Sequence, residues 1–344
     1  VAGRLKSSTL PQAADIYIIC VPTPLRDAGG APEPDIENVI AATHSIAPFV
    51  KPDDLVILES TSPVGTTEKM ATILRDEGVP VDEVLIAYCP ERVLPGRIMI
   101  ELVENDRIVG GLTADATSAV ADFYRTFVRG KVLETNAKTA ELCKLAENSF
   151  RDVNIAFANE LSLICDKEGI DVWGLIQLAN RHPRVNILQP GPGVGGHCIA
   201  VDPWFIVARD VENTKLIRSA REVNNYKTDW VIDKIKVVVA DRFTETGKMP
   251  KIACLGLAFK HDIDDLREAP ALHIALSLQT VGYEVLAVEP NIESHDGLSL
   301  VTIDEALDQA DIFIVLVKHR QFMVPAVKRQ LARKVSLDFC GALI

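Results

Sequence analysis

One thiol stands in an unusually glycine-rich part of the sequence. The segment 190–203 reads Pro-Gly-Pro-Gly-Val-Gly-Gly-His-Cys-Ile-Ala-Val-Asp-Pro, so Cys198 follows four glycines and precedes Asp202 by four positions. Glycine lets the main chain approach another group closely and adopt positive φ, and a thiol serves catalysis where it is accessible and can ionise. Cys198 is therefore the first candidate nucleophile. The alternative is a flexible loop with an uninvolved cysteine.

Hydroxyl and carboxylate side chains follow several expected strands. Thr23 lies in a Pro-Thr-Pro turn and Thr61 in a Ser-Thr-Ser-Pro turn, and Thr66 is placed to cap the next helix. Glu91 follows a third strand and suits a general base or a group that orients water. Because open parallel sheets bind ligands beyond the carboxyl ends of their strands, these turns are a candidate cofactor edge. Ordinary turn residues and a solvated acid are the alternative.

Polar residues share one side of a long helix expected over 139–167, because three or four positions separate them. They are Glu141, Lys144, Asn148 and Asp152. Such a stripe is either solvated or forms one wall of a site. In the second case, Lys144 and Asn148 are placed to hydrogen-bond an oxyanion.

A second candidate anion site follows a strand near the end of the chain. Gly256 is the one glycine of that turn, where a dinucleotide fingerprint needs three. Lys260 and Arg267, beside a helix N-terminus, nevertheless suit a diphosphate. Further donors precede the glycine-rich segment, namely Arg181, Arg184 and Asn186. His182 and His197 lack a second ligand at helical or loop spacing, so no metal site is expected.

Composition is typical of a globular protein and excludes several classes. The 344 residues suggest two or three domains. A formal net charge of -12 argues against a nucleic-acid surface. Seven cysteines without a Cys-x-x-Cys pair favour reduced thiols in a cytoplasm, and apolar runs such as 312–317 are too short to span a membrane. We expect a soluble protein.

Strands and helices are expected to alternate in two parts of the chain. The first part has strands over 16–21, 55–58, 84–87, 107–109 and 132–133 and helices over 36–49, 67–77 and 114–128. The second has strands over 252–255, 284–288, 312–317 and 335–337 and helices over 270–281, 303–309 and 321–333. Alternation of this kind predicts doubly wound parallel sheets.

Between these parts only helices are expected, over 139–167, 171–180 and 215–241. The sequence therefore predicts an α/β fold in which two doubly wound, Rossmann-like domains are joined by an α-helical connector. The expected domains are 1–135, 136–245 and 246–344.

Six motifs in this order resemble those of the UDP-glucose/GDP-mannose dehydrogenase family, over nearly the whole chain. They are Val21–Pro24, Ser60–Thr61 with Pro63–Gly65, Pro90–Glu91, Glu141–Asn148, Gly193–Pro203 and Gly256–Pro270. Segments 91–96 and 195–204 look most like the branch that oxidises UDP-N-acetylhexosamines. Pro95, where glucose-specific relatives have a glutamate, and Val201, which replaces a lysine, favour that branch.

The resemblance implies an NAD-dependent, four-electron oxidation of a sugar-nucleotide C6 alcohol to a carboxylate, with UDP-N-acetyl-D-mannosamine as the expected substrate. Cys198 attacks the aldehyde to give a thiohemiacetal, and a second hydride transfer leaves a thioester that water hydrolyses. The other catalytic residues so implied are Lys144 and Asp202 for charge and protons, Asn148 for the oxyanion, and Thr61 with Glu91 for the hydrolytic water.

The family also implies binding residues. Those for the UDP-sugar are Arg184, Gly191, Gly193, Gly195, Phe259 and Lys260, and those for NAD are Thr23, Thr61 and Arg267. A homodimer through the long helix and a place in polysaccharide biosynthesis are expected as well. The family's first strand and Gly-x-Gly-x-x-Gly turn are absent from these 344 residues, and the chain starts at Val1, so we expect that an N-terminal part of the dinucleotide-binding domain is missing.

Three alternatives stay open. In the first, the substrate is UDP-N-acetylglucosamine or another UDP-sugar. In the second, the chain is an inactive fragment that binds a nucleotide sugar and dimerises without the NAD fingerprint. The third alternative is a cysteine-dependent acyl transferase without NAD, which the paired α/β domains disfavour.

Overall fold

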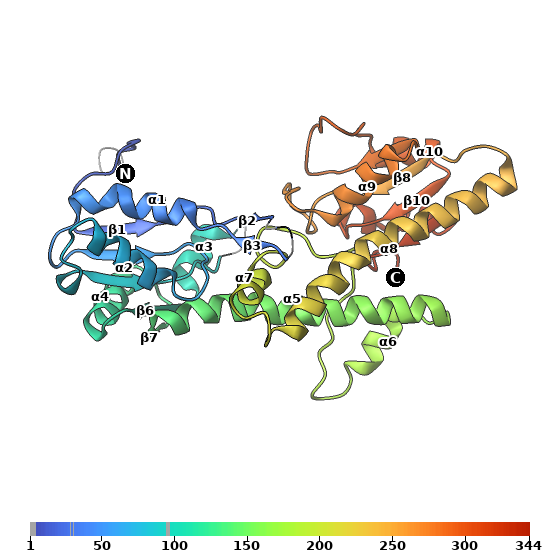
Figure 1. Ribbon diagram of the computed structural model, residues 1–344. Helices are drawn as coiled ribbons and strands as arrows, with labels where there is room; N and C mark the ends of the chain where they lie inside the picture. Colours follow the sequence, from blue (N-terminus) through green and yellow to red (C-terminus); the bar gives the residue numbers. More distant parts are fainter. Residues whose placement is uncertain (1–4, 28, 30, 94–96) are drawn as a thin grey trace. The chain divides into compact units, whose positions relative to one another are not determined.

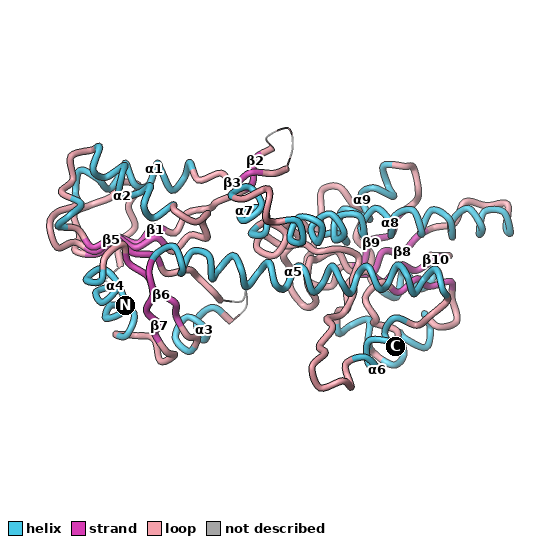
Figure 2. The backbone as a smooth tube through the Cα atoms, turned by 60° about the horizontal axis from the view of Figure 1, so that its bottom comes forward, coloured by secondary structure: helices cyan, strands magenta, loops and turns pink. Residues whose placement is uncertain are grey.

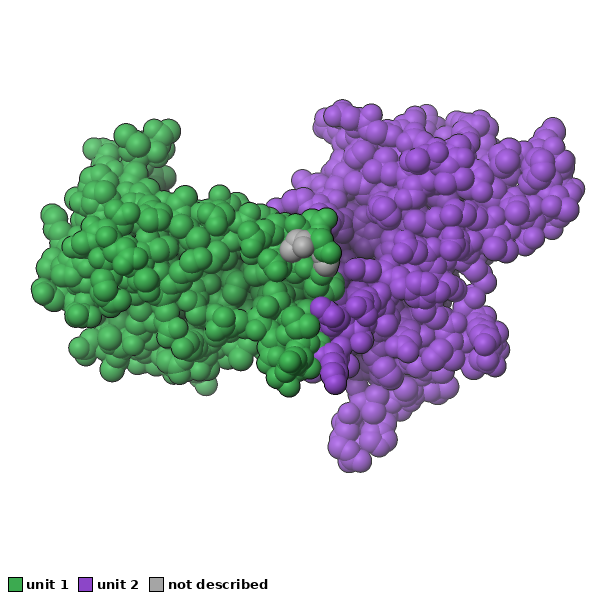
Figure 3. Space-filling view, viewed as in Figure 1, with its two compact units in different colours: residues 1–148, 201–214 green, residues 149–200, 215–344 purple. Residues whose placement is uncertain are grey.

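The computed structural model describes residues 5–27, 29, 31–93 and 97–344. The chain divides into two compact units (Figure 3): unit 1 comprises residues 1–148 and 201–214, and unit 2 comprises residues 149–200 and 215–344. The division falls within the long helix α5 (Ala137–Glu168). The predicted turn residue Pro95 lies outside the described residues. The domain limits at 135 and 245 stay a prediction.

Unit 1 contains a five-stranded sheet with the order β1-β4-β5-β6-β7. Its strands are β1 (Ile16–Ile19), β4 (Leu55–Leu58), β5 (Leu85–Tyr88), β6 (Arg107–Gly111) and β7 (Val132–Asn136). All strands predicted for this region are present. β6 runs antiparallel to β5, whereas the other pairs are parallel, so the sheet is not wholly parallel. Among its described residues, 89–93 and 97–106, the segment between β5 and β6 contains the short helix α3 (Ile98–Glu104), and no covering helix carries the chain across the sheet to a parallel strand there.

Helices cover both faces of this sheet (Figure 2). Helices α1 (Glu37–Ile46) and α2 (Thr66–Asp76) pack on one face, where Val56 and Leu58 point, and α4 (Ala114–Arg125) packs on the other face against Ile57. Alternate residues of a strand point to opposite faces, so an unbroken apolar strand such as β4 is buried on both sides. The smaller elements of the unit are β2 (Leu25–Arg26), β3 (Glu33–Pro34), the 3-10 turns Ala47–Phe49 and Val81–Glu83, and α7 (Asp202–Arg209).

Unit 2 contains a wholly parallel sheet with the order β11-β10-β8-β9. Its strands are β8 (Ile252–Leu255), β9 (Val285–Val288), β10 (Ile312–Val315) and β11 (Val335–Asp338). Helices α8 (Lys215–Thr246) and α9 (Pro270–Thr280) cover one face, and α10 (Ile303–Gln309), α11 (Pro325–Leu331) and the 3-10 turn Arg320–Met323 cover the other (Figure 1). The short helix α6 (Val172–Ala179) follows α5. The predicted α/β architecture with helical connections is thus present.

The start of α2 differs from the prediction. Gly65, with φ at +96°, is the N-cap residue, and Thr66 is the first helical residue. The hydroxyl of Thr66 donates to the carbonyl of Pro63 at 2.7 Å instead of accepting from the helix. The carboxylate of Glu141 accepts from the N–H groups of Gly65 at 2.6 Å and Thr67 at 2.8 Å. The predicted cap at Thr66 is therefore wrong, because a buried carboxylate from α5 satisfies the free donors of the helix end.

Candidate active site

The glycine-rich loop of unit 2 lies directly against the segment 259–270 of the same unit. A side-chain carbon at Gly195 would lie 2.3 Å from the main-chain oxygen of Glu268, and one at Gly196, where φ is +82°, would lie 3.0 Å from the ring of Phe259. At its start, the N–H of Gly191 donates to Asn159 Oδ1 at 2.9 Å. The segment 259–270 therefore occupies the space beside these glycines, and no residue with a side chain fits where the two main chains meet.

Cys198 follows this contact and is half-buried. The N–H of Gly196 donates to the carbonyl of Arg267 at 3.2 Å, and the Arg267 guanidinium bonds the Asp265 carboxylate, with Nη2 and Oδ2 2.6 Å apart. The hydrogen bond and the charge of Asp265 raise the pKa of Arg267, and an electrostatic interaction with Cys198 contributes to a smaller extent. Arg267, predicted to contact NAD, therefore lies in the electrostatic environment of Cys198.

Two other predicted substrate residues lie near the same loop. The ring of Phe259 lies against Gly196, and Lys260 beside it is exposed. Arg184 is exposed in the segment that precedes the loop, and its N–H donates to His182 Nδ1 at 3.3 Å. Within unit 2 the structure therefore brings together the thiol, the glycines, Phe259 and Arg267.

Unit 1 brings together three of the predicted catalytic residues. Lys144 and Asn148 lie one turn apart on α5, and Asp202 is the first residue of α7. Asn148 Nδ2 donates to Asp202 Oδ2 at 2.6 Å. Burial raises the pKa of Asp202 to about 6, against the opposite effects of the Asn148 hydrogen bond and the Lys144 charge. A carboxylate with such a pKa can exchange a proton near neutral pH.

The carboxyl ends of β1, β4 and β5 carry the other predicted residues of unit 1. Thr23 Oγ1 donates to the carbonyl of Thr61 at 2.6 Å, so the two turns are joined. Glu91 is partly exposed and paired, because its Oε2 accepts from Arg107 Nη1 at 3.2 Å and Nη2 at 3.3 Å. Sequence reasoning missed Arg107, which is 1% exposed. An arginine that opens an otherwise apolar strand was the available signal.

Glu59 was also missed, although it directly follows β4. Its Oε2 accepts from the thiol of Cys20 at 3.1 Å, and its Oε1 accepts from the hydroxyl of Tyr124. Its position directly after a buried strand was a signal in the sequence. Its hydrogen-bond partners lie on other elements, so the sequence alone did not identify them. Glu59 and Glu91 give this edge two acidic side chains.

Two members of the predicted polar stripe on α5 have structural partners. Glu141 bonds the start of α2, as described above. Asp152, in unit 2, accepts from Arg221 Nη1 at 2.6 Å and Asn224 Nδ2 at 2.8 Å, and both its partners are buried. The stripe therefore divides into Lys144 and Asn148, which join Asp202, and two carboxylates that tie helices together.

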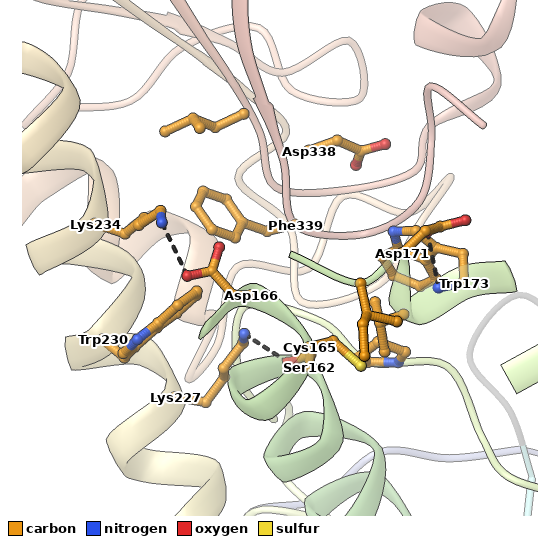
Figure 4. A pocket seen from close by; sticks show the side chains of 14 residues that line it. Ser162, Cys165, Asp166, Asp171, Trp173, Lys227, Trp230, Lys234, Asp338 and Phe339 are labelled. Carbon is orange, nitrogen blue, oxygen red and sulfur yellow. Dashed lines mark hydrogen bonds and ion pairs between the residues drawn. The ribbon is translucent and has the colours of Figure 1, made fainter. Parts of the chain in front are cut away.

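Unit 2 also contains a cavity of about 230 Å³ (Figure 4). Lys227 is buried beside it, its Nζ donates to Ser162 Oγ at 2.8 Å, and its charge lies 4.0 Å from the centre of the Trp230 ring. Burial lowers the pKa of Lys227 to about 7. The rest of the lining is Cys165, Asp166, Ile170, Asp171, Val172, Trp173, Pro190, Lys234, Leu337, Asp338 and Phe339. The predicted site residues do not line this cavity.

Neither a metal-binding cluster nor a membrane-spanning helix is found in the part of the chain that the structure describes. There, no three His, Cys, Asp or Glu side chains gather closely enough to hold a metal ion. Across the same residues, no helix combines the length and the apolar character that a membrane crossing needs.

Three sequence profiles of one family match the chain in order. The NAD binding domain of the UDP-glucose/GDP-mannose dehydrogenase family matches residues 1–128, its central domain matches residues 138–226, and its UDP binding domain matches residues 253–343. Together they account for most of the sequence.

Individual relatives are similar over nearly the whole chain. UDP-N-acetyl-D-mannosamine dehydrogenase of Escherichia coli (strain K12) is 56% identical over 341 residues, which cover 94% of this chain and 80% of the relative. NDP-N-acetyl-D-galactosaminuronic acid dehydrogenase of Ralstonia nicotianae is 52% identical over 93% of this chain and 77% of its own length. The solved structure of UDP-N-acetyl-mannosamine dehydrogenase Cap5O from Staphylococcus aureus is 40% identical with a TM-score of 0.85, over 99% of this chain and 80% of that one.

Proposed function

This chain belongs to the UDP-glucose/GDP-mannose dehydrogenase family, and from that premise we propose that it oxidises UDP-N-acetyl-D-mannosamine to UDP-N-acetyl-D-mannosaminuronate. It is an NAD-dependent oxidoreductase of nucleotide sugars. One observation carries the choice of substrate: 56% identity, over 94% of the chain, to a relative named for it. The 52% identical relative is named for a galactosaminuronic acid, so a different UDP-N-acetylhexosamine is the second candidate.

The proposed chemistry passes through Cys198. Bound NAD would supply the hydride acceptor for the two oxidations at C6, with one NAD consumed in each. After the first, the thiolate adds to the aldehyde carbon, and the thiohemiacetal oxygen takes up a proton. After the second, the sugar is held as a thioester. Water then adds to the thioester carbonyl, the carbon–sulfur bond breaks, and the carboxylate leaves while the thiol is restored.

Five residues of unit 1 supply protons and hydrogen bonds in this proposal. Asp202, whose pKa is raised to about 6, exchanges the proton of the C6 hydroxyl together with Lys144. Asn148 uses one amide N–H for Asp202 and keeps the second for the oxyanion. Glu91, fixed by Arg107, holds the hydrolytic water with Thr61.

The residues present suit part of the NAD site and the UDP-sugar site. Thr23 and Thr61 are joined at the carboxyl ends of β1 and β4, which is where an open sheet binds a dinucleotide. We propose that they contact NAD, as does Arg267, and that Phe259, Lys260 and Arg184 bind the UDP-sugar. The main chain of Gly191, Gly193 and Gly195 completes that site.

Replacing Cys198 with serine tests the covalent route. We expect Cys198→Ser to stop uronate formation while UDP binding stays close to that of the wild type, because the serine hydroxyl is far less ionised than a thiol. The assay follows NADH and the sugar product by mass spectrometry, with several UDP-N-acetylhexosamines as substrates. Cys340→Ser is the matched control, since Cys340 is also a half-buried thiol of unit 2. Uronate production by Cys198→Ser at the wild-type rate would refute the covalent route.

We also propose that the protein is a homodimer through α5. Phe150, Phe157 and Ile164 are 70%, 53% and 53% exposed and lie seven residues apart, so they form an apolar stripe along one side of the helix. A second copy of the helix is the proposed cover. Phe157→Asp should then shift the mass measured by light scattering from dimer toward monomer, and an unchanged mass would contradict this interface.

The location proposed for the protein is the cytoplasm. No disulfide bond joins any of the seven cysteines, all of which lie in the described residues, as is usual for proteins of a reducing compartment. The uronate product is expected to supply polysaccharide biosynthesis.

A further inference from the structure

A buried carboxylate fills the turn where a Rossmann-like domain ordinarily receives a phosphate. Glu289 directly follows β9, and its Oε2 accepts from the N–H groups of Leu257 at 2.8 Å and Ala258 at 3.1 Å, just after β8. Main-chain N–H groups of the first such turn bind the diphosphate in dinucleotide-binding domains. In unit 2 the anion at this position is therefore part of the protein, which explains why the turn needs only one glycine, Gly256.

His319 links this carboxylate to a second point of the chain. Its side chain is fully buried, with Nε2 2.9 Å from Glu289 Oε2 and Nδ1 2.9 Å from the main-chain nitrogen of Asp262. Because a main-chain N–H can only donate, Nδ1 is the acceptor, and Nε2 therefore carries the proton and donates to Glu289. The histidine is a neutral bridge between Glu289 and Asp262.

Glu289 is held on all sides. Its Oε1 accepts from the main-chain N–H of Asn291 at 3.1 Å and from Asn291 Nδ2 at 2.9 Å. Burial alone would raise the pKa of Glu289, but the hydrogen bonds from His319, Leu257 and Ala258 lower it to about 2. This carboxylate is therefore a permanent internal anion.

The main-chain N–H groups that bond Glu289 and His319 lie on either side of a short segment. Leu257 and Ala258 precede residues 259–261, and Asp262 follows them. Asp262 has φ at +60°, and its carboxylate also accepts from the main-chain N–H and Nε of Arg320, both at 3.0 Å. Both ends of the segment 259–261 are therefore fixed to one buried pair, while Phe259 packs on Gly196 and Lys260 is exposed.

We propose that Glu289 and His319 are positioning residues that hold Phe259 and Lys260 in place for the UDP-sugar. The inference rests on the proposed function, in which these two side chains bind the nucleotide sugar. Neither Glu289 nor His319 is exposed, so their effect on the ligand passes through the main chain of residues 257–262. The loss of either bond should weaken UDP-sugar binding more than it slows the chemical steps.

His319 Nδ1 also accepts from Asn291 Nδ2 at 3.1 Å. Two substitutions of His319 separate its bond to Glu289 from its bonds at Nδ1. Asparagine places its carbonyl oxygen near the position of Nδ1, so His319→Asn keeps an acceptor for Asp262 and loses the bond to Glu289. Glutamine places its amide near the position of Nε2, so His319→Gln keeps the donor to Glu289 and loses the acceptor. We expect His319→Gln to weaken UDP binding about tenfold and His319→Asn about threefold or less, by the usual effect of one buried hydrogen bond.

The measurements are calorimetric titration with UDP, KM and kcat for the UDP-sugar, KM for NAD, and the melting temperature. A positioning role raises KM for the UDP-sugar with kcat and the KM for NAD within about twofold. His273→Gln is the matched control, because His273 is an exposed histidine on α9 of the same unit. Equal UDP affinity for wild type and folded His319→Gln overturns the inference.

A failure of the proposed function would give a different result from a failure of the positioning inference. If the wild-type protein does not bind UDP, the assignment of Phe259 and Lys260 is wrong, and the inference falls with it. If the His319 variants do not fold, Asn291→Ala replaces them, since it removes the amide bonds to Glu289 Oε1 and to His319 Nδ1 and leaves the bonds from His319 to Glu289 and Asp262 in place. We then expect UDP to bind about two- to threefold more weakly, and unchanged affinity overturns the inference.

Discussion

The carboxylates of Asp202 in unit 1 and Glu289 in unit 2 are equally buried, at 3% and 5% exposure, but their surroundings differ. Asp202 accepts one hydrogen bond, from Asn148, and has the charge of Lys144 nearby. Glu289 accepts from three main-chain N–H groups, from the Asn291 amide and from His319. The pKa of Asp202 is raised to about 6, whereas that of Glu289 is lowered to about 2.

The comparison distinguishes the effect of burial on the pKa of a carboxylate from the effect of its hydrogen-bond donors. Burial removes a carboxylate from water and raises its pKa, and each donor that faces the ionised form lowers it again. With one hydrogen bond, Asp202 stays near the pKa at which a group can both accept and return a proton. With five, Glu289 cannot act in proton transfer and serves as a fixed charge. The number of donors thus distinguishes a carboxylate that does chemistry from one that holds a loop.

The largest effect that this comparison predicts follows from Asp202→Asn. If Asp202 moves the C6 proton, the amide should lower kcat/KM by about 10²- to 10⁴-fold. In the wild type, kcat/KM should rise as the pH passes through about 6, because Asp202 becomes ionised there. The variant should lose that limb of the pH profile. Steady-state rates over pH 5–8 check both points.

Glu141→Gln is the matched control for this prediction. Glu141 is also buried and lies one turn before Lys144 on α5, but it bonds the start of α2. We expect a lower melting temperature with a rate within about tenfold of the wild type and the limb at pH 6 retained. If Glu141→Gln loses that limb and Asp202→Asn keeps it, the group that titrates near pH 6 is Glu141 and the prediction for Asp202 is wrong.

The two carboxylates should also change stability with pH in opposite directions. Asp202 has a raised pKa, so its contribution is full below its ordinary pKa of 3.8 and is lost as the pH rises through about 6. Glu289 has a lowered pKa, so its contribution is full above 4.5 and is lost as the pH falls toward about 2. At about 1.4 kcal/mol per pKa unit, each amounts to about 3 kcal/mol over its whole range.

Denaturant unfolding of Asp202→Asn, Glu289→Gln and the wild type at pH 3, 5 and 7 measures these contributions. The difference between wild type and Glu289→Gln should shrink by about 2 kcal/mol from pH 5 to pH 3, which covers part of the range of Glu289. Relative to Asp202→Asn, the wild type should instead gain stability as the pH falls from 7 to 4. The same pH trend for both variants would show that the two environments do not differ as described.

Much of the fold followed from local patterns in the sequence. The strands 55–58 and 252–255 and the helix 303–309 have the predicted limits, because apolar runs and capping residues act over a few positions. In the helix 303–309, for example, Thr302 and Glu305 form a capping box. The grouping of Asn148 with Asp202 was implied by the family resemblance and is present in unit 1.

Partners that are distant in the sequence were not predicted. Glu141 caps a helix that begins 75 positions earlier, at Thr66, and His319 bonds an acid 30 positions away. The antiparallel pairing of β6 depends on which strand it meets, and nothing in its own residues records that choice. Local propensity fixes elements, whereas such pairs depend on how the elements pack, so one sequence does not reveal them.

The smallest predicted effect is a shift of the Asp202 titration when its single hydrogen bond is removed. Asn148 Nδ2 donates to the ionised carboxylate, so Asn148→Ala should raise the pKa of Asp202 further. A hydrogen bond of about 1 kcal/mol corresponds to about 0.5 to 1 pH unit. The acidic limb of kcat/KM should move upward by that amount, even though the lost oxyanion donor also lowers the rate at every pH. A limb that stays in place or moves down would mean that Asn148 does not set the protonation of Asp202, and the contrast with Glu289 would then have to rest on the remaining neighbour, Lys144.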